Sequence, residues 1–310
     1  MEVHVLGSIA YDRILFFDGN FGEHILPGKV HELSVSFDIG TIDESFGGTA
    51  GNIVYTLALL GAPGIPYGMV GDDFGKYEAW FSSHNIPTDR IVWVPGTLSS
   101  QAHIMTDRND NQITGFHQGA GRGAYTGTLP RVAELAIIAP ANPDIMKQFA
   151  LHYRKLKTRY IFDPGQQTTT FTKEQFTECL SGAWMFIAND YETALALKKT
   201  GWSEEELREK VPVVIETLGD NGSAVYADGI KHAIGIAWAE EVVDPTGAGD
   251  AYRAGLLAGI ARGFSITIAA RMGATAASYA VEKKGTQNHT FTKEAFAARH
   301  EKAFSESLAL

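Results

Sequence analysis

Short apolar runs followed by amphipathic segments repeat along most of the chain, and this order limits the possible folds more than any other feature. The strand candidates are residues 3–9, 66–70, 134–138, 159–162, 184–187 and 213–217. The helix candidates are residues 51–60, 74–84, 143–156, 190–199, 249–262 and 265–283. Because strand-then-helix repetition is typical of a parallel sheet covered on both faces, we predict an α/β fold with a doubly wound, mostly parallel sheet.

Two stretches depart from this order and predict a small β-rich lid. Residues 13–17 and 33–37 are strand-like runs, the second with alternating apolar and polar side chains, and no convincing helix lies nearby. Residues 101–106 and 112–116 are typical of a hairpin turning at Asn109-Asp110-Asn111. We therefore expect a single domain over residues 1–310, with lid strands drawn from about residues 13–46 and 100–117.

The composition is that of a globular protein, with 45% apolar and 20% charged residues. A net charge of −10 argues against nucleic-acid binding, which normally needs a basic patch. An acidic chain can still bind a polyanion where glycine loops and helix ends supply a local positive field. The single cysteine, Cys179, and the lack of an apolar run of about eighteen residues favour a cytoplasmic protein without a membrane segment.

The most informative glycine-rich segment is residues 244–250, directly before a predicted helix. Gly247 and Gly249 allow backbone N–H groups to converge at the positive end of the helix dipole, where an anion can bind. Asp250 beside such an anion site can take a proton from a hydroxyl that attacks a phosphorus atom. From the residues alone, a glycine-rich turn with Asp250 as the helix N-cap is an equally good interpretation.

A second glycine-rich segment, residues 46–52, also leads into a helix. Gly47 and Gly48 permit close approach to a ligand, and Asn52 can both donate and accept hydrogen bonds. A simple turn capped by Thr49 remains an alternative. Other nucleotide and metal motifs are missing, since the sequence has no Walker A loop, no three-glycine dinucleotide fingerprint and no zinc-type cluster.

Taken together, these segments resemble the ribokinase-like (PfkB-type) carbohydrate kinase family. The matching motifs follow the family order and cover nearly the whole chain: residues 7–12, 47–52, 189–192, 217–219, 244–257 and 277–286. The resemblance implies an ATP-dependent kinase with a small-molecule acceptor. The departures are mild: Tyr252 stands where the family often has Phe, and Arg253 is not a fixed feature.

The resemblance also implies roles for individual residues. Asp250 would be the catalytic base, with an anion hole formed by Gly247, Ala248 and Gly249. The acceptor would be held by Asp12, Gly47, Gly48 and Asn52. Nucleotide-binding residues would be Asn189, Thr217, Gly219, Gly222 and Gly285. Asn189 and Glu192 would position Mg²⁺ indirectly, and Asp244 lies where some relatives help to bind K⁺.

Residues 23–31 and 110–117 resemble the adenosine and broad-specificity nucleoside kinases within this family. Gln101 and Phe116 could then contact a base, although ordinary packing of lid strands is the more conservative interpretation. We expect phosphorylation of a nucleoside 5′-hydroxyl, as in purine salvage. A kinase for a free sugar or sugar phosphate is the alternative, and a non-catalytic binding relative is a second one. The chain could be a monomer or a homodimer paired through the lid.

Overall fold

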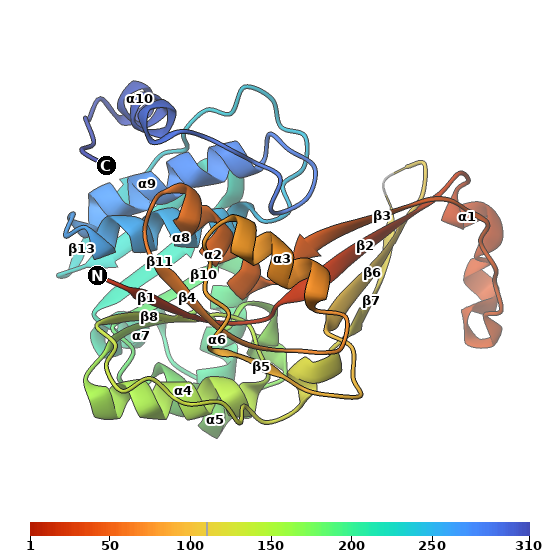
Figure 1. Cartoon of the computed structure of the whole chain (residues 1–310), viewed down its shortest axis with the longest axis horizontal. Coiled ribbons are helices and arrows are strands. Elements are labelled where there is room, and N and C mark those ends of the chain that lie inside the picture. Colours follow the sequence, from red (N-terminus) through yellow and green to blue (C-terminus); the bar gives the residue numbers. More distant parts are fainter. Residues whose placement is uncertain (110) are drawn as a thin grey trace.

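The computed structural model describes residues 1–109 and 111–310, and its main body is built on a nine-stranded sheet (Figure 1). The strand order is β13-β12-β11-β10-β9-β8-β1-β4-β5. All neighbours from β11 to β5 are parallel, whereas β12 and β13 are antiparallel additions at one edge. The strands are β1 (Val3–Leu6), β4 (Gly64–Val70), β5 (Ile91–Trp93), β8 (Leu135–Ile138), β9 (Arg159–Phe162), β10 (Met185–Asn189), β11 (Val213–Thr217), β12 (Ser223–Ala227) and β13 (Ile230–Ile234).

Helices cover both faces of this sheet, which confirms the predicted doubly wound α/β fold (Figure 1). Successive strand side chains point to opposite faces, so Leu135 and Ile137 join one hydrophobic cluster and Ala136 and Ile138 join the other. The first cluster is completed by α2 (Thr49–Leu59), α3 (Gly75–Ser83), α8 (Ala248–Ala261), α9 (Ile266–Ala280) and α10 (Lys293–Phe304). The second is completed by α4 (Pro143–Leu156), α5 (Lys173–Leu180), α6 (Asp190–Thr200) and α7 (Glu204–Lys210).

A separate four-stranded sheet projects from the main body and forms the lid (Figure 1). Its order is β3-β2-β6-β7, with strands β2 (Ala10–Phe17), β3 (Ile39–Gly47), β6 (Ser100–Thr106) and β7 (Gln112–His117). The central pair β2–β6 is parallel and the outer pairs are antiparallel. The predicted hairpin is present, because Gln101 pairs with His117 and Thr106 with Gln112. Asp110, in its predicted turn, lies outside the described residues.

The alternating run at residues 33–37 does not form a strand, contrary to the sequence prediction. The lid tip instead contains α1 (Phe21–His24) and a 3-10 helix (Pro27–Glu32). The ring of Phe37 packs 4.9 Å from that of Phe17 and 5.1 Å from that of Phe21. From this run, Phe37 therefore joins an aromatic cluster with Phe17 and Phe21, here called the tip cluster, whereas Leu33 and Val35 are exposed.

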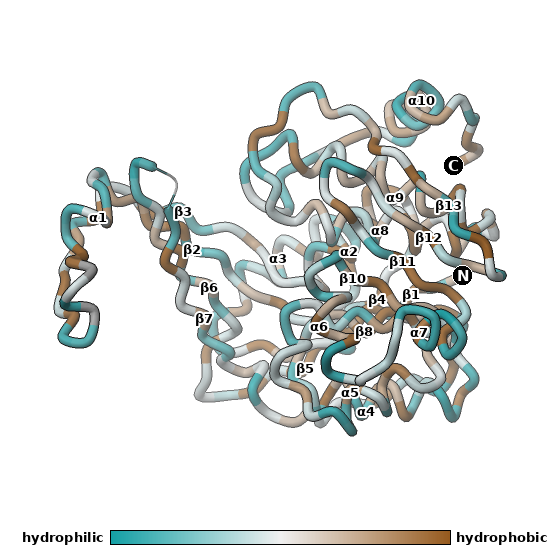
Figure 2. Tube along the Cα trace, turned by 180° about the vertical axis from the view of Figure 1, so that it is seen from behind, coloured by the Kyte–Doolittle hydropathy of each residue, from teal (hydrophilic) through white to brown (hydrophobic). Residues whose placement is uncertain are grey.

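Hydrophobic stretches run through the central sheet, while the lid strands contain both hydrophobic and hydrophilic residues (Figure 2). Among the helices in the described part of the chain, none has the length and apolar character needed to cross a bilayer. The carboxyl ends of the parallel strands all lie at one edge of the sheet, which is where α/β folds place their ligands.

Candidate active site

The first turn of α8 has the form of an anion-binding helix end. Its N-cap is Gly247, with φ 81°, and a Cβ at this position would lie 3.0 Å from Thr286. Glycine is required there because L-residues rarely adopt this conformation. Ala248 and Gly249 follow in the first turn, so the predicted anion-hole residues lie at the positive end of the helix dipole. The Ala248 N–H, however, donates to the Pro245 carbonyl over 3.2 Å. Asp250 is not the N-cap, so the capping interpretation is wrong.

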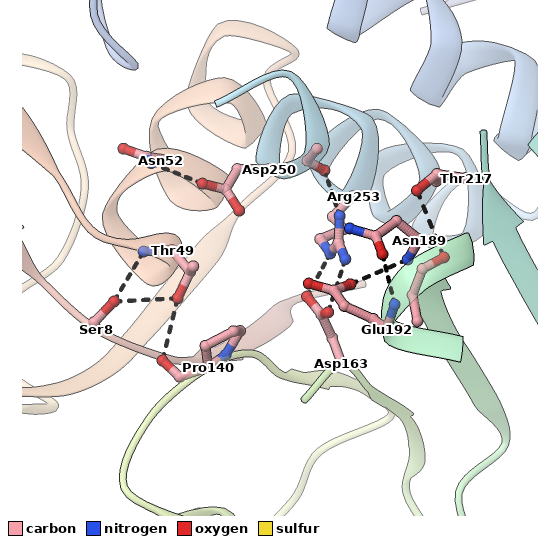
Figure 3. Close-up of polar contacts among 12 residues, drawn as sticks. Ser8, Thr49, Asn52, Pro140, Asp163, Asn189, Glu192, Thr217, Asp250 and Arg253 are labelled. Carbon is pink, nitrogen blue, oxygen red and sulfur yellow. Dashed lines mark hydrogen bonds and ion pairs between the residues drawn. The ribbon is translucent and has the colours of Figure 1, made fainter. Parts of the chain in front are cut away.

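Asp250 and Asn52 are distant in the chain but lie next to each other, and the sequence analysis placed both in one site (Figure 3). The Asn52 Nδ2 donates to Asp250 Oδ2 over 2.7 Å. Burial raises the pKa of Asp250 to about 6, while the nearby charge of Arg253 and the Asn52 hydrogen bond act in the opposite direction. At neutral pH the carboxylate is therefore mostly ionised, as a proton acceptor must be.

The start of α2 holds Asn52 in place and is tied to the carboxyl end of β1. Its N-cap is Gly48, with φ 85°, and a Cβ there would lie 2.6 Å from the Ser8 carbonyl oxygen. The Thr49 N–H donates to Ser8 Oγ over 3.1 Å, and the Thr49 hydroxyl donates to the Pro140 carbonyl over 3.3 Å (Figure 3). Thr49 is thus not a cap, and the glycine pair permits tight contact between α2 and the sheet edge.

Asp12 lies on β2 and faces Gly47, and both residues were predicted to bind the acceptor substrate. A Cβ on Gly47 would lie 2.1 Å from Asp12 Oδ2, so this close approach needs glycine. Burial, together with the negative charge of Asp244, raises the pKa of Asp12 to about 6. The charge of Asp12 in turn contributes to the raised pKa of Asp250. The root of the lid therefore contributes a second carboxyl group to the same site.

A buried ion pair between Arg253 and Asp163 borders the anion site, and sequence reasoning did not anticipate it. The Arg253 Nη2 donates to Asp163 Oδ1 over 2.7 Å, and its Nε donates to Asp163 Oδ2. The Arg253 Nη1 donates to the Gly249 carbonyl over 3.0 Å. Two sequence features could have placed these residues at the site. Arg253 follows Asp250 by three residues on one helix, and Asp163 directly follows the parallel strand β9.

Asn189 and Glu192 lie at the carboxyl end of β10 and form a reciprocal capping box on α6 (Figure 3). The Glu192 N–H donates to Asn189 Oδ1 over 2.7 Å, and the Asn189 N–H donates to Glu192 Oε2 over 3.0 Å. Burial raises the pKa of Glu192, and the nearby Asp163 adds to the effect. Among the described residues, no group of three or more metal-ligating side chains occurs. One carboxylate beside a phosphate site suits Mg²⁺ that keeps most of its waters.

The other predicted nucleotide residues lie in turns on the same side of the sheet. Thr217 ends β11, and Gly219 and Gly222 follow in the β11–β12 turn with φ 56° and 79°. Gly285 has φ 82°, and its N–H donates to Asp244 Oδ2 over 3.0 Å. Asp244 Oδ1 accepts from the Thr246 N–H over 2.9 Å. Asp244 thus orders the entry to α8, and its role with K⁺ stays a prediction.

A pocket lies between the main sheet and the lid, and it contains Phe116 but not Gln101. Phe116 is 47% exposed. Further lining residues are Ser8, Gln118, Tyr125, Asn142, Gln166 and Gln167. Gln101 is buried: its Nε2 donates to Asp73 over 3.0 Å and its Oε1 accepts from Arg13 over 3.0 Å. These bonds favour the packing interpretation for Gln101, and a direct base contact by this residue stays a prediction.

Comparison with known proteins places this geometry in a family. The model of the pfkB family of carbohydrate kinases matches residues 2–293. The chain belongs to the pfkB family. This membership makes it an ATP-dependent kinase of the carbohydrate and nucleoside class.

The similar proteins include two, from different organisms, that carry the name nucleoside kinase. The enzyme of Methanocaldococcus jannaschii is 30% identical over 279 residues, which cover 88% of this chain and 91% of the relative. The Burkholderia thailandensis nucleoside kinase in complex with inosine is 35% identical, with a TM-score of 0.89 over 98% of this chain and 99% of that one. Its ADP-inosine complex is 36% identical, with a TM-score of 0.84 over 98% and 97%. The pfkB fold of this chain therefore extends over both the main body and the lid.

Proposed function

We propose that this pfkB-family chain is a nucleoside kinase that transfers the γ-phosphoryl group of ATP to the 5′-hydroxyl of a nucleoside. The pocket beside Ser8 carries this proposal. It offers an aromatic face from Phe116 and amide groups from Gln118, Gln166 and Gln167, which suit a neutral heterocyclic base. Among its described lining residues, none is lysine or arginine, whereas a sugar-phosphate acceptor would need a cation for its second phosphate.

The chemistry follows from the groups around Asp250. Its carboxylate accepts the proton of the attacking hydroxyl as the oxygen forms a bond to the γ-phosphorus. The bond between that phosphorus and the oxygen bridging to the β-phosphate then breaks, and ADP leaves. Asp12 and Asn52 orient the acceptor, while the N–H groups of Gly247 and Gly249 stabilise the transferred phosphoryl oxygens.

Glu192 and Asn189 are the residues that would hold Mg²⁺, through water, on the donor side of the site. The ion would neutralise charge on the β- and γ-phosphates. Arg253 balances the negative charge of the buried Asp163, so this carboxylate does not repel the phosphates of the nucleotide. Activation by K⁺ near Asp244 is checked by comparing initial rates in potassium and in sodium buffers of equal ionic strength.

A substrate panel tests the proposal. ADP release from ATP and Mg²⁺ is measured with adenosine, inosine, guanosine, cytidine, ribose, fructose and fructose 6-phosphate. We expect turnover with nucleosides, above all purine nucleosides, and little with free sugars. Turnover confined to sugars would overturn the acceptor but leave the kinase assignment intact. Nucleoside binding without turnover would favour the non-catalytic alternative.

A further inference from the structure

A chain of buried hydrogen bonds leads from the surface of α3 to the proposed base. The Trp80 Nε1 donates to Gln287 Oε1 over 2.9 Å, and the Gln287 Nε2 donates to Asn52 Oδ1 over 3.0 Å. The Asn52 Nδ2 then donates to Asp250 Oδ2 over 2.7 Å. Gln287 is 2% exposed and Asn52 is 5% exposed. Four separate segments of the chain, three of them helices, therefore converge on one carboxylate.

The direction of this chain is set by two groups bonded to Gln287: one can only donate, and the other already uses its only hydrogen elsewhere. An indole N–H is a donor only, so Trp80 requires the oxygen of the Gln287 amide to face it. The Tyr77 hydroxyl donates to the Gly47 carbonyl over 2.8 Å, so its oxygen accepts from Gln287 Nε2. The Gln287 amide is thus locked, and it presents a donor to Asn52 Oδ1.

We propose that Gln287 is a positioning residue: held by Trp80 and Tyr77, it fixes the Asn52 carboxamide so that its NH₂ group faces Asp250. This inference rests on the proposed role of Asp250 as the base. An amide nitrogen carries two hydrogens, so Asn52 can donate to Asp250 and to the acceptor hydroxyl at once. If the Asn52 amide turned over, its oxygen would face the carboxylate at hydrogen-bond distance, and this repulsion would favour a protonated Asp250 that cannot accept a proton.

The packing around the chain is specific to it. A Cβ on Gly51 would lie 2.0 Å from Tyr77 Oη and 3.0 Å from Gln287 Nε2, so the third glycine of the segment 46–52 makes room for both groups. The Trp80 ring is stacked on Phe46 at 5.3 Å and on Tyr55 at 5.8 Å between centroids. These contacts hold the indole N–H in its orientation toward Gln287.

Other groups also act on the carboxyl of Asp250. Arg253 faces it from α8 itself, Asp163 from the end of β9, Asp12 from β2 and Tyr77 from α3, while Glu192 on α6 acts on Arg253. The variants Gln287→Met and Trp80→Phe leave every one of these groups in place. A change in the titration of Asp250 in both variants therefore reports the Asn52 amide.

The test is the pH dependence of kcat for nucleoside phosphorylation in the wild type, Gln287→Met and Trp80→Phe. Loss of a hydrogen bond to a charged group should move the acidic limb up by about one pH unit. The rate should therefore fall roughly fivefold at about pH 6, roughly threefold at about pH 6.5, and recover to within about twofold at about pH 8.5. The KM for ATP should not change. Tyr160→Phe, which removes a buried hydroxyl bonded to the Cys179 carbonyl, is the control, and we expect its pH profile to match the wild type.

Profiles that superimpose on the wild type, or a loss of rate that is equal at every pH in both variants, would overturn the inference while the proposed function stands. If the wild type phosphorylates no nucleoside, the proposed function fails instead. The pKa of Asp250 is then measured by NMR of ¹³C-labelled aspartate, with Asp250→Asn assigning the signal. A higher pKa in Gln287→Met supports the positioning role, and an unchanged pKa refutes it.

Discussion

The site is built from two regions that differ in how the chain holds them. The floor, defined here as Asn52, Asp163, Glu192, Asp250 and Arg253, is supplied by the main body, and Asp163 in it is 1% exposed. The lid supplies Phe116 from β7, a strand whose residues are all exposed. Buried or half-buried groups, four of them paired as Asn52 with Asp250 and Arg253 with Asp163, suit the phosphoryl transfer, which needs fixed geometry. Exposed strand faces suit acceptor recognition, since a side chain there can change at little cost to folding.

The largest expected effect on turnover comes from Asp250→Asn in the floor. We expect kcat to fall by about 10³-fold, because an amide cannot accept the proton. The raised pKa of Asp250 means that the folded state favours its protonated form, so this carboxyl lowers stability as pH rises through about 6. The variant should therefore unfold at no lower urea concentration than the wild type at about pH 7.5. Unchanged turnover would remove Asp250 from the mechanism.

Next in size is the contrast between two ion pairs, one in each region. Arg253→Met leaves Asp163 buried without its partner, and we expect the free energy of unfolding to fall by about 3–5 kcal/mol. Arg13→Met removes the half-exposed lid pair with Glu44 and should cost less than about 1 kcal/mol. Urea unfolding of both variants measures the difference, and similar losses would contradict the division into floor and lid.

The pH dependence of kcat/KM in the wild type tests which carboxyl groups of the site must be ionised. The pKa values of Asp250 and Asp12 are both raised to about 6. Their ionised forms act on the acceptor, so kcat/KM should fall about a hundredfold as pH drops from about 7 to 5, whereas a tenfold fall would show that only one of them must be ionised. Because the two carboxyls interact, the midpoint belongs to the pair. A profile flat down to about pH 5 would show that neither group must be ionised.

The lid gives the smallest expected effect. Phe116→Ala should raise the KM for a nucleoside about tenfold and leave kcat nearly unchanged, because stacking on a base contributes about 1–3 kcal/mol. Ile113 lies on the opposite face of β7 and is similarly exposed, so Ile113→Ala is the matched control with no expected change. Equal effects from the two variants would show that Phe116 acts only through strand packing.

The same division explains what the sequence could predict. Parallel strands buried on both faces produce near-continuous apolar runs, so the strands at 159–162 and 213–217 were predicted with their observed bounds. Glycines with positive φ at 48 and 247 mark the two helix entrances. The lid was harder, because its strands have no such burial. Residues 33–37 have the alternation of a strand, yet Phe37 packs on Phe17 in the tip cluster and the run forms no strand.

Partners in the site were less predictable than the motifs themselves. Asp163 and Gln287 are common residue types with no local motif, and their importance arises from contacts with residues 90 and 235 positions away. Gln101 shows the same limit, since its position in the hairpin is compatible with either a base contact or packing, and only the structure shows that its amide is bonded to Asp73 and Arg13. Long-range pairing of this kind can be seen only once the fold is known.

The tip cluster has a consequence for how the lid can move. Phe17 and Phe21 are buried against Phe37 and stand apart from both hydrophobic clusters of the main body. A projection with its own small core keeps its apolar surface covered wherever it points, so swinging it as a unit exposes little new hydrophobic area to water. The free-energy cost of opening and closing then falls mainly on the few backbone positions at its root, which is the condition for a hinge.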